Sequence, residues 1–125
     1  MGRPKRGVNW LEDVAEKDYA AALSYLTLRL SPSKARGCVK SLRKAKLQLF
    51  RANDILRAAG LDPAPRDDPG VEKNVRKIGV GQELSPILLV NLSVGVDIAD
   101  GYHRVSAVYY EDPDAYIPAR LGRGW

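Results

Sequence analysis

An acid, a glycine, a histidine and an arginine lie close together in the stretch Asp100-Gly101-Tyr102-His103-Arg104, and His103 is the only histidine of the chain. The residues before it, 96–99, are typical of a strand, and residues 102–110 are typical of a helix. The first N–H groups of a helix lack acceptors and, together with the helix dipole, attract anions. The spacing therefore predicts an anion site at a strand-to-helix turn.

Each residue type in this stretch suits part of such a site. Gly101 allows a ligand or the backbone to approach closely. Arg104 can hold a phosphate or carboxylate through two N–H groups, and His103 can donate a hydrogen bond or move a proton near neutral pH. Asp100 can cap the helix, orient His103 or meet Mg²⁺ carried by a nucleotide. The candidate catalytic residues are His103 and Asp100, and the candidate ligand-binding residues are Gly101, Tyr102, His103 and Arg104.

A purely structural interpretation of the same residues stays open. Asp100 would then be only a helix cap, His103 a half-buried side chain with a satisfied hydrogen bond, and Arg104 a surface group. The strand-turn-helix setting favours function, because an anion site requires that setting.

Composition places limits on the class of protein. With 125 residues, 45% of them apolar, the chain is expected to form one small domain with its own core. Neither a membrane span of about 18–20 apolar residues nor a signal peptide is expected, which favours a cytoplasmic protein. The single Cys38 is expected to be a small buried apolar residue, and no metal site is predicted.

Positive charge is concentrated in the N-terminal half. Residues 1–60 carry 13 Lys/Arg and 5 Asp/Glu, or +8, whereas residues 61–125 carry 7 and 10, or −3. The most basic segment is a predicted helix over residues 34–46, where Lys40, Arg43 and Lys44 are the candidate nucleic-acid contacts. The alternative is a basic helical surface that is only solvated.

The N-terminal half is predicted to be helical. Residues 1–8 are expected to form a flexible basic arm, followed by helices at 10–30, 34–46 and 52–59. Asn9 and Ser33 are the expected N-caps, and Gly60 suits the position after a helix end. Residues 52–61 are similar to the first half of a helix-turn-helix, but Pro63 and Pro65 follow at once and the next helix begins too late.

The second half is predicted to carry a small sheet. A Pro-rich loop at 61–70 leads to a helix at 71–78, strands at 87–92, 96–99 and 115–121, and the motif-bearing helix at 102–110. The apolar strand 87–92 is expected to be buried on both faces, and Pro118 indicates an edge position for the last strand. The expected fold is α+β: one domain over 9–125, with about three strands in a mixed sheet, a helical subregion at 9–60 and a motif-bearing core at 71–121.

The order of these elements resembles the ParB/sulfiredoxin superfamily. The resemblance covers Val71 to Leu121: a basic helix, a glycine turn, the strand Pro86-Ile87-Leu88-Leu89-Val90, and Asp100-Gly101-Tyr102-His103-Arg104. Family members place nucleotide phosphates on the loop and helix start that correspond to Gly101, His103 and Arg104. The resemblance therefore implies a phosphate-binding pocket, with ATP, ADP or CTP and Mg²⁺ as the implied ligands.

The chain differs from several of the family's motif patterns, and these differences make some of the family's activities less expected here. Sulfiredoxins have a nucleophilic Cys where Tyr102 stands, and the partition proteins have Gly-Glu-Arg-Arg and a following DNA-binding domain, whereas this chain stops soon after its last predicted strand. The kinase-like members, with Asp-Gly-His-His-Arg, are the most similar. Their catalytic acid has no clear counterpart here, and Glu83 is the nearest carboxylate.

Three functions follow as hypotheses, and whether the chain is an enzyme is left open. The first is a stand-alone nucleotide- or phosphate-binding domain that acts as a phosphotransferase or nucleotide hydrolase. The second is a nucleic-acid-binding or nuclease module that uses the helix at 34–46 and the arm Arg3 to Arg6. The third is an interaction protein in which the motif is only structural.

Overall fold

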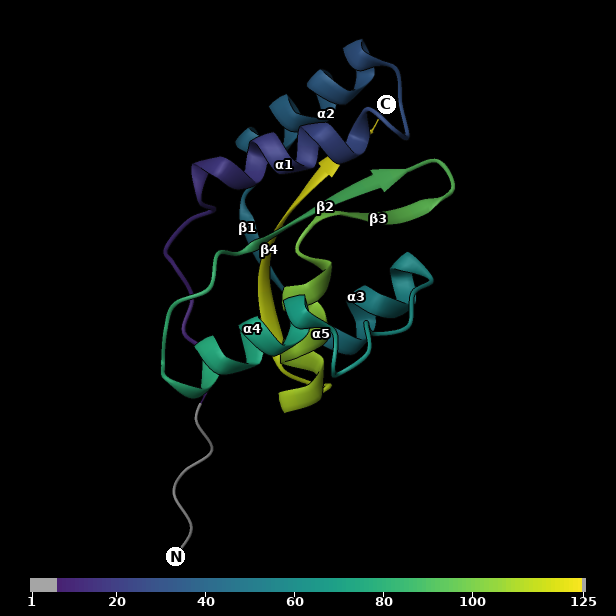
Figure 1. The fold of residues 1–125 in the computed structure, drawn as a ribbon. Helices are drawn as coiled ribbons and strands as arrows, with labels where there is room; N and C mark the ends of the chain where they lie inside the picture. Colours follow the sequence, from purple (N-terminus) through teal and green to yellow (C-terminus); the bar gives the residue numbers. More distant parts are fainter. Residues whose placement is uncertain (1–6, 125) are drawn as a thin grey trace, which may run out of the picture.

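The computed structural model describes residues 7–124 and shows a four-stranded mixed sheet between two layers of helices (Figure 1). The strands are β1 (Leu47–Arg51), β2 (Ile87–Leu92), β3 (Gly95–Asp100) and β4 (Tyr116–Arg123). Helices α1 (Glu16–Leu26) and α2 (Pro32–Lys44) cover one face, and α3 (Ala52–Ala59), α4 (Pro69–Gly79) and α5 (Tyr102–Glu111) cover the other. The α+β class is confirmed, with four strands rather than about three.

The sheet has the order β1-β4-β2-β3. β4 pairs antiparallel with β1 and parallel with β2, and β2 pairs antiparallel with β3. The prediction of an edge position for the last strand is therefore wrong. Pro118 is tolerated in this inner strand because pairing with β2 begins only at Ala119, so Pro118 has a strand neighbour on the β1 side alone.

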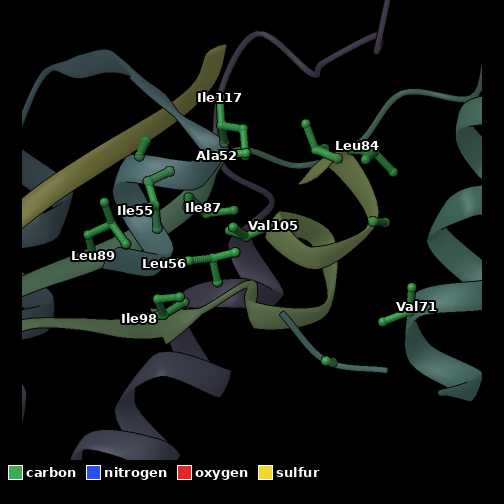
Figure 2. Packing of buried hydrophobic residues seen from close by; sticks show 14 of the residues in the cluster. Ala52, Ile55, Leu56, Val71, Leu84, Ile87, Leu89, Ile98, Val105 and Ile117 are labelled. Atoms are coloured by element: carbon green, nitrogen blue, oxygen red, sulfur yellow. The ribbon is translucent and has the colours of Figure 1, made fainter. Parts of the chain in front are cut away.

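β2 is buried on both faces, as its nearly continuous apolar sequence predicted. Ile87 and Leu89 pack into the core under α3, α4 and α5, shown in Figure 2, whereas the alternate residues Leu88 and Val90 pack into the core under α1 and α2. The period of two along a strand divides one apolar run between the two cores. Cys38 lies in the second of these cores and is buried, as expected.

The first helix is shorter than predicted, because residues 10–15 are not helical and the helix ends at Leu26. Leu84 donates to the carbonyl of Asn9 (2.8 Å) and accepts from the N–H of Leu11 (2.8 Å), so this segment bonds to the chain before β2 instead of forming helical bonds. Asn9 is therefore not a helix cap. The N-cap position of α1 is Ala15, whose N–H donates to Ser85 Oγ at 2.9 Å.

The remaining boundaries differ by a few residues, except that one strand was missed. Ser31, not Ser33, caps α2 and is followed by Pro32 at the first helical position. α3 has the predicted bounds, and Gly60 follows it with φ 67°. α4 starts at Pro69, too late after α3 for a helix-turn-helix. β1 was missed because it has only five residues, two of them polar.

The loop before α4 is fixed to α5 by three side chains that recur every four residues. The Tyr102 hydroxyl donates to the carbonyl of Asp62 (2.7 Å), and the Tyr110 hydroxyl donates to the carbonyl of Ala64 (2.7 Å). The buried Ser106 accepts from the N–H of Ala64 (2.9 Å). The N-terminal half also supplies β1 to the common sheet, so residues 9–60 are not wholly helical.

Two further predictions concern a membrane span and the basic N-terminal arm. Along residues 7–124 there is no helix long and apolar enough to cross a membrane. The first six residues of the predicted basic arm lie outside the part of the chain that the structure describes.

Candidate functional site

The motif lies where β3 ends and α5 begins, as predicted. Asp100 is the last residue of β3, Gly101 has φ 119°, and α5 starts at Tyr102. A Cβ on Gly101 would lie 2.5 Å from Ile87 Cγ2, so glycine is required both for the backbone conformation and for the approach to β2. The first helical bond runs from Val105 N to the carbonyl of Gly101 (2.9 Å), and the N–H groups before it have no acceptor within the helix.

The Arg104 guanidinium is bonded within the protein, not directed at a ligand. Its Nη1 lies 2.8 Å from Asp18 Oδ2 and 3.1 Å from the carbonyl of Ser85, and its Nη2 lies 2.6 Å from Asp100 Oδ2. The side chains of Arg104, Asp18 and Asp100 are only 13%, 10% and 21% exposed. The guanidinium N–H groups that the sequence suggested for binding a phosphate are therefore bonded to two carboxylates of the chain.

Asp100 neither caps α5 nor orients His103, which are the two roles within the protein that the sequence suggested. It makes no capping bond to α5, whose N-cap residue is Gly101, and its carboxylate binds Arg104 rather than His103. Burial raises the pKa of Asp100, as does the nearby charge of Asp18, whereas the Arg104 guanidinium opposes the rise. Asp100 thus serves to hold the turn together through Arg104.

His103 instead faces the start of α4. Its Nε2 lies 3.4 Å from Asp68 Oδ1, and the same oxygen caps α4 by accepting from the N–H of Gly70 at 2.8 Å. The ring lies so close to Gly70 that a Cβ there would be 2.9 Å from it. His103 is half-exposed and therefore accessible to a ligand, while its ring also contacts that of Tyr102 at 5.6 Å between centroids.

A pocket of about 310 Å³ opens over this turn. α1 contributes Lys17 and Asp18, α4 contributes Gly70, Lys73, Asn74 and Lys77, and the turn contributes residues 100–104. Four cationic side chains (Lys17, Lys73, Lys77 and Arg104) face two carboxylates (Asp18 and Asp100), which leaves a net charge of +2 with neutral His103. The two carboxylates are bonded to Arg104, so the three lysines supply the uncompensated charge.

The lysines are close enough to affect one another. The pKa of Lys77 is lowered, first by burial and then by the charges of Lys73 and Lys17. A bound anion would relieve this repulsion. Sequence reasoning missed these residues: Lys73 and Lys77 were not among the predicted ligand contacts, although their spacing of four places them on one helix face. Nothing in the sequence marked Lys17 or Asp18, because α1 approaches the turn only in the folded chain.

The other candidate residues lie elsewhere. Arg43 donates to both carboxylate oxygens of Glu16 and lies 4.1 Å above the ring of Tyr19. Lys40 and Lys44 are exposed on α2 and line a different hollow. Glu83 is exposed and does not line the pocket at the turn, so it gives no support to a catalytic acid there.

No metal site is apparent in residues 7–124, where no group of three or more His, Cys, Asp or Glu side chains is arranged to hold an ion. The fold and the site thus define an α+β domain with a cationic pocket at a strand-to-helix turn. Comparison with protein-family models, curated proteins and solved structures gives no match to this chain.

Proposed function

We propose that this domain binds a phosphate-bearing ligand in the pocket over Gly101, with the phosphate held by Lys17, Lys73, Lys77 and the first N–H groups of α5. The observation that carries the proposal is the convergence of three lysines, from two helices, on one helix start. Helix N–H groups and lysine ammonium groups are the two donors that phosphate sites commonly combine.

A nucleotide is the proposed ligand. The pocket, at about 310 Å³, lies at the small end of ligand sites and suits a phosphate chain more than a whole nucleotide. Base and sugar would extend from it past the half-exposed His103. The resemblance to the ParB/sulfiredoxin superfamily supports the same ligand class and the same turn. Mg²⁺, if present, would be bound through the phosphates, since Asp100 is bonded to Arg104.

Binding is better supported than phosphoryl transfer or hydrolysis. Of the two candidate catalytic residues, Asp100 is bonded to Arg104, and only His103 faces the pocket with a group that can move a proton. One half-exposed imidazole is enough to contact a phosphate but supplies neither a nucleophile nor a second proton-transfer group. The proposed activity is therefore nucleotide or polyphosphate binding.

Thermal shift and calorimetric titration with ATP, ADP, CTP, GTP and inorganic tripolyphosphate, each with and without Mg²⁺, test this proposal. At least one ligand should raise the Tm by several degrees. The double variant Lys73→Gln/Lys77→Gln should weaken binding of that ligand by about thirtyfold to a thousandfold, since each charged hydrogen bond contributes about 1–2 kcal/mol. The matched control Lys40→Gln/Lys44→Gln removes the same charge from α2 and should change the affinity less than about threefold by screened long-range attraction alone. A Tm that no ligand raises, or equal losses in both double variants, would overturn the proposal.

A further inference from the structure

A second cationic region lies in the layer of α1 and α2, between α2 and the end of β4. Two neighbouring hollows of about 560 and 310 Å³ share Gly37, Ser41 and Arg123 in their lining and together form one groove. Ser41 Oγ accepts from the N–H of Arg123 (3.1 Å), which joins the two walls. The buried Gly122 allows this approach, because a Cβ there would lie 3.0 Å from the Leu42 side chain. In Figure 1, β4 runs toward α2.

The groove has cations and no acids. Lys34, Lys40 and Lys44 line it and are exposed, and neither hollow is lined by an Asp or Glu. α2 contains five Lys/Arg and no acidic residue, and within residues 7–124 only Arg43 of these five pairs with a carboxylate. Arg36, Lys40 and Lys44 also recur every four residues, a spacing at which like charges repel and destabilise a helix.

Gly37 has no packing reason to be glycine. A Cβ at Gly37 would meet nothing within 4 Å, and its φ is not positive. Alanine would therefore make a more stable helix at this place. Glycine does leave the backbone of α2 bare where it lines both hollows, so that a ligand can approach it closely.

From these three features we infer that the groove binds the phosphodiester backbone of a duplex nucleic acid. Lys40 and Lys44, which are exposed and four residues apart on α2, can meet successive phosphates along a strand. No aromatic side chain lines either hollow in the described chain, so the stacking platform of single-strand binders is absent from it. An anionic membrane fits less well, because the groove is concave and the apolar face of α2, with Ala35, Cys38 and Leu42, is buried in the core.

The experiment is a binding titration of the full chain with fluorescent duplexes of DNA and of RNA, single-stranded DNA, and vesicles rich in phosphatidylserine, at 50 and 200 mM salt. With about four phosphate contacts, the duplex affinity should fall about a hundredfold between the two salt concentrations. Lys40→Gln/Lys44→Gln should weaken binding about tenfold or more and reduce the slope of log affinity against log salt by about 2. Comparing the affinities for the DNA duplex and the RNA duplex shows which nucleic acid supplies the phosphodiester backbone that the groove binds.

Two variants separate a groove from general positive charge. Arg57→Gln/Arg76→Gln removes equal charge from α3 and α4 and should leave the slope nearly unchanged. Gly37→Ala should raise the Tm by a few degrees and still weaken duplex binding, because the added methyl group covers the bare backbone that lines the groove. The inference would be overturned by an equal loss of duplex affinity in both double variants, or by Gly37→Ala binding the duplex as tightly as the wild type. It would also be overturned by tighter binding of vesicles or single strands than of duplexes, or by no duplex binding at 50 mM salt. Because nucleotide binding is tested by Lys73→Gln/Lys77→Gln, either proposal can fail alone.

Discussion

Arg104 Nη1 lies 2.8 Å from Asp18 Oδ2, although 86 residues separate them in the chain. This ion pair joins the first turn of α1 to the first turn of α5, and its partners are almost excluded from solvent. It brings Lys17, the neighbour of Asp18, to the pocket over Gly101. Arg104 is therefore central to the site as the group that positions it, while the lysines around it remain available to a ligand.

Replacing Arg104 should expose this positioning role. Arg104→Gln leaves Asp18 and Asp100 as poorly solvated carboxylates without a cation, and should lower the free energy of unfolding by about 2–4 kcal/mol at pH 7. The pKa of Asp100, which burial already raises, then rises further because the Arg104 cation no longer opposes the shift, so the stability lost in the variant grows as pH rises and shrinks as pH falls. Urea unfolding at pH 7 and pH 4.5 measures both effects.

Arg76→Gln, on the exposed surface of α4, is the control and should change the stability by less than about 0.5 kcal/mol. An Arg104→Gln loss that is the same at both pH values, or smaller than about 1 kcal/mol, would contradict the assignment of Arg104 to the two buried carboxylates.

Two glycines with positive φ should respond differently to alanine. Gly101→Ala adds a Cβ 2.5 Å from Ile87 Cγ2 and also requires a left-handed backbone, so we expect a loss of about 3 kcal/mol or more. Gly60→Ala has a positive φ of 67° but nothing within 4 Å of the added Cβ, and should cost only about 1 kcal/mol. Chemical denaturation of both variants measures the difference, and losses of similar size would argue against the close contact at Ile87.

Lys77 should lower the stability of the free protein and strengthen the binding of a phosphate ligand. Burial and the charges of Lys73 and Lys17 lower its pKa, so keeping Lys77 charged in the folded protein costs stability at neutral pH. Lys77→Met should raise the Tm at pH 7.5, and this gain should shrink as the pH approaches 10.5, where the wild-type lysine is discharged. With tripolyphosphate present the order should reverse, because the wild type alone keeps the full set of ligand contacts.

Arg76→Met, on the same helix but outside the pocket over Gly101, is the matched comparison for Lys77→Met. A gain in Tm for Arg76→Met as large as that for Lys77→Met would show that loss of any charge on α4 stabilises the protein. The proposed conflict between the three lysines would then have no support.

Asp13 should contribute to the loss of stability of the protein at acid pH. Arg120 donates to both its carboxylate oxygens, at 2.8 and 2.9 Å, and holds the pKa of Asp13 below its usual 3.8. A lowered folded-state pKa gives stability that is present above pH 3.8 and lost as pH falls below it. Asp13→Asn should therefore lower the Tm at pH 6, with the difference from wild type closing toward pH 2.5. Glu12→Gln, at the adjacent exposed residue, should show no such closing difference.

The sequence predicted the local features because they depend on near neighbours. The apolar run in β2 indicated burial on both faces, Gly60 marked the end of α3, and Asp100-Gly101-Tyr102 marked the strand-to-helix turn. The same local logic failed for residues 10–15, whose backbone bonds to Leu84 across the fold, and for Pro118, whose strand lies inside the sheet. In both cases a distant partner outweighed the local preference.

By itself, the sequence determined that the chain forms an α+β fold and that an anion site is expected at Gly101. Only the tertiary structure decided which side chains serve that site. Arg104 is claimed by Asp18 and Asp100, whereas Lys17, Lys73 and Lys77 converge on the helix start from α1 and α4. The physical reason is that the backbone conformation at a turn is set by adjacent residues, but the partner of a charged side chain is whichever opposite charge the packing of remote helices brings within reach.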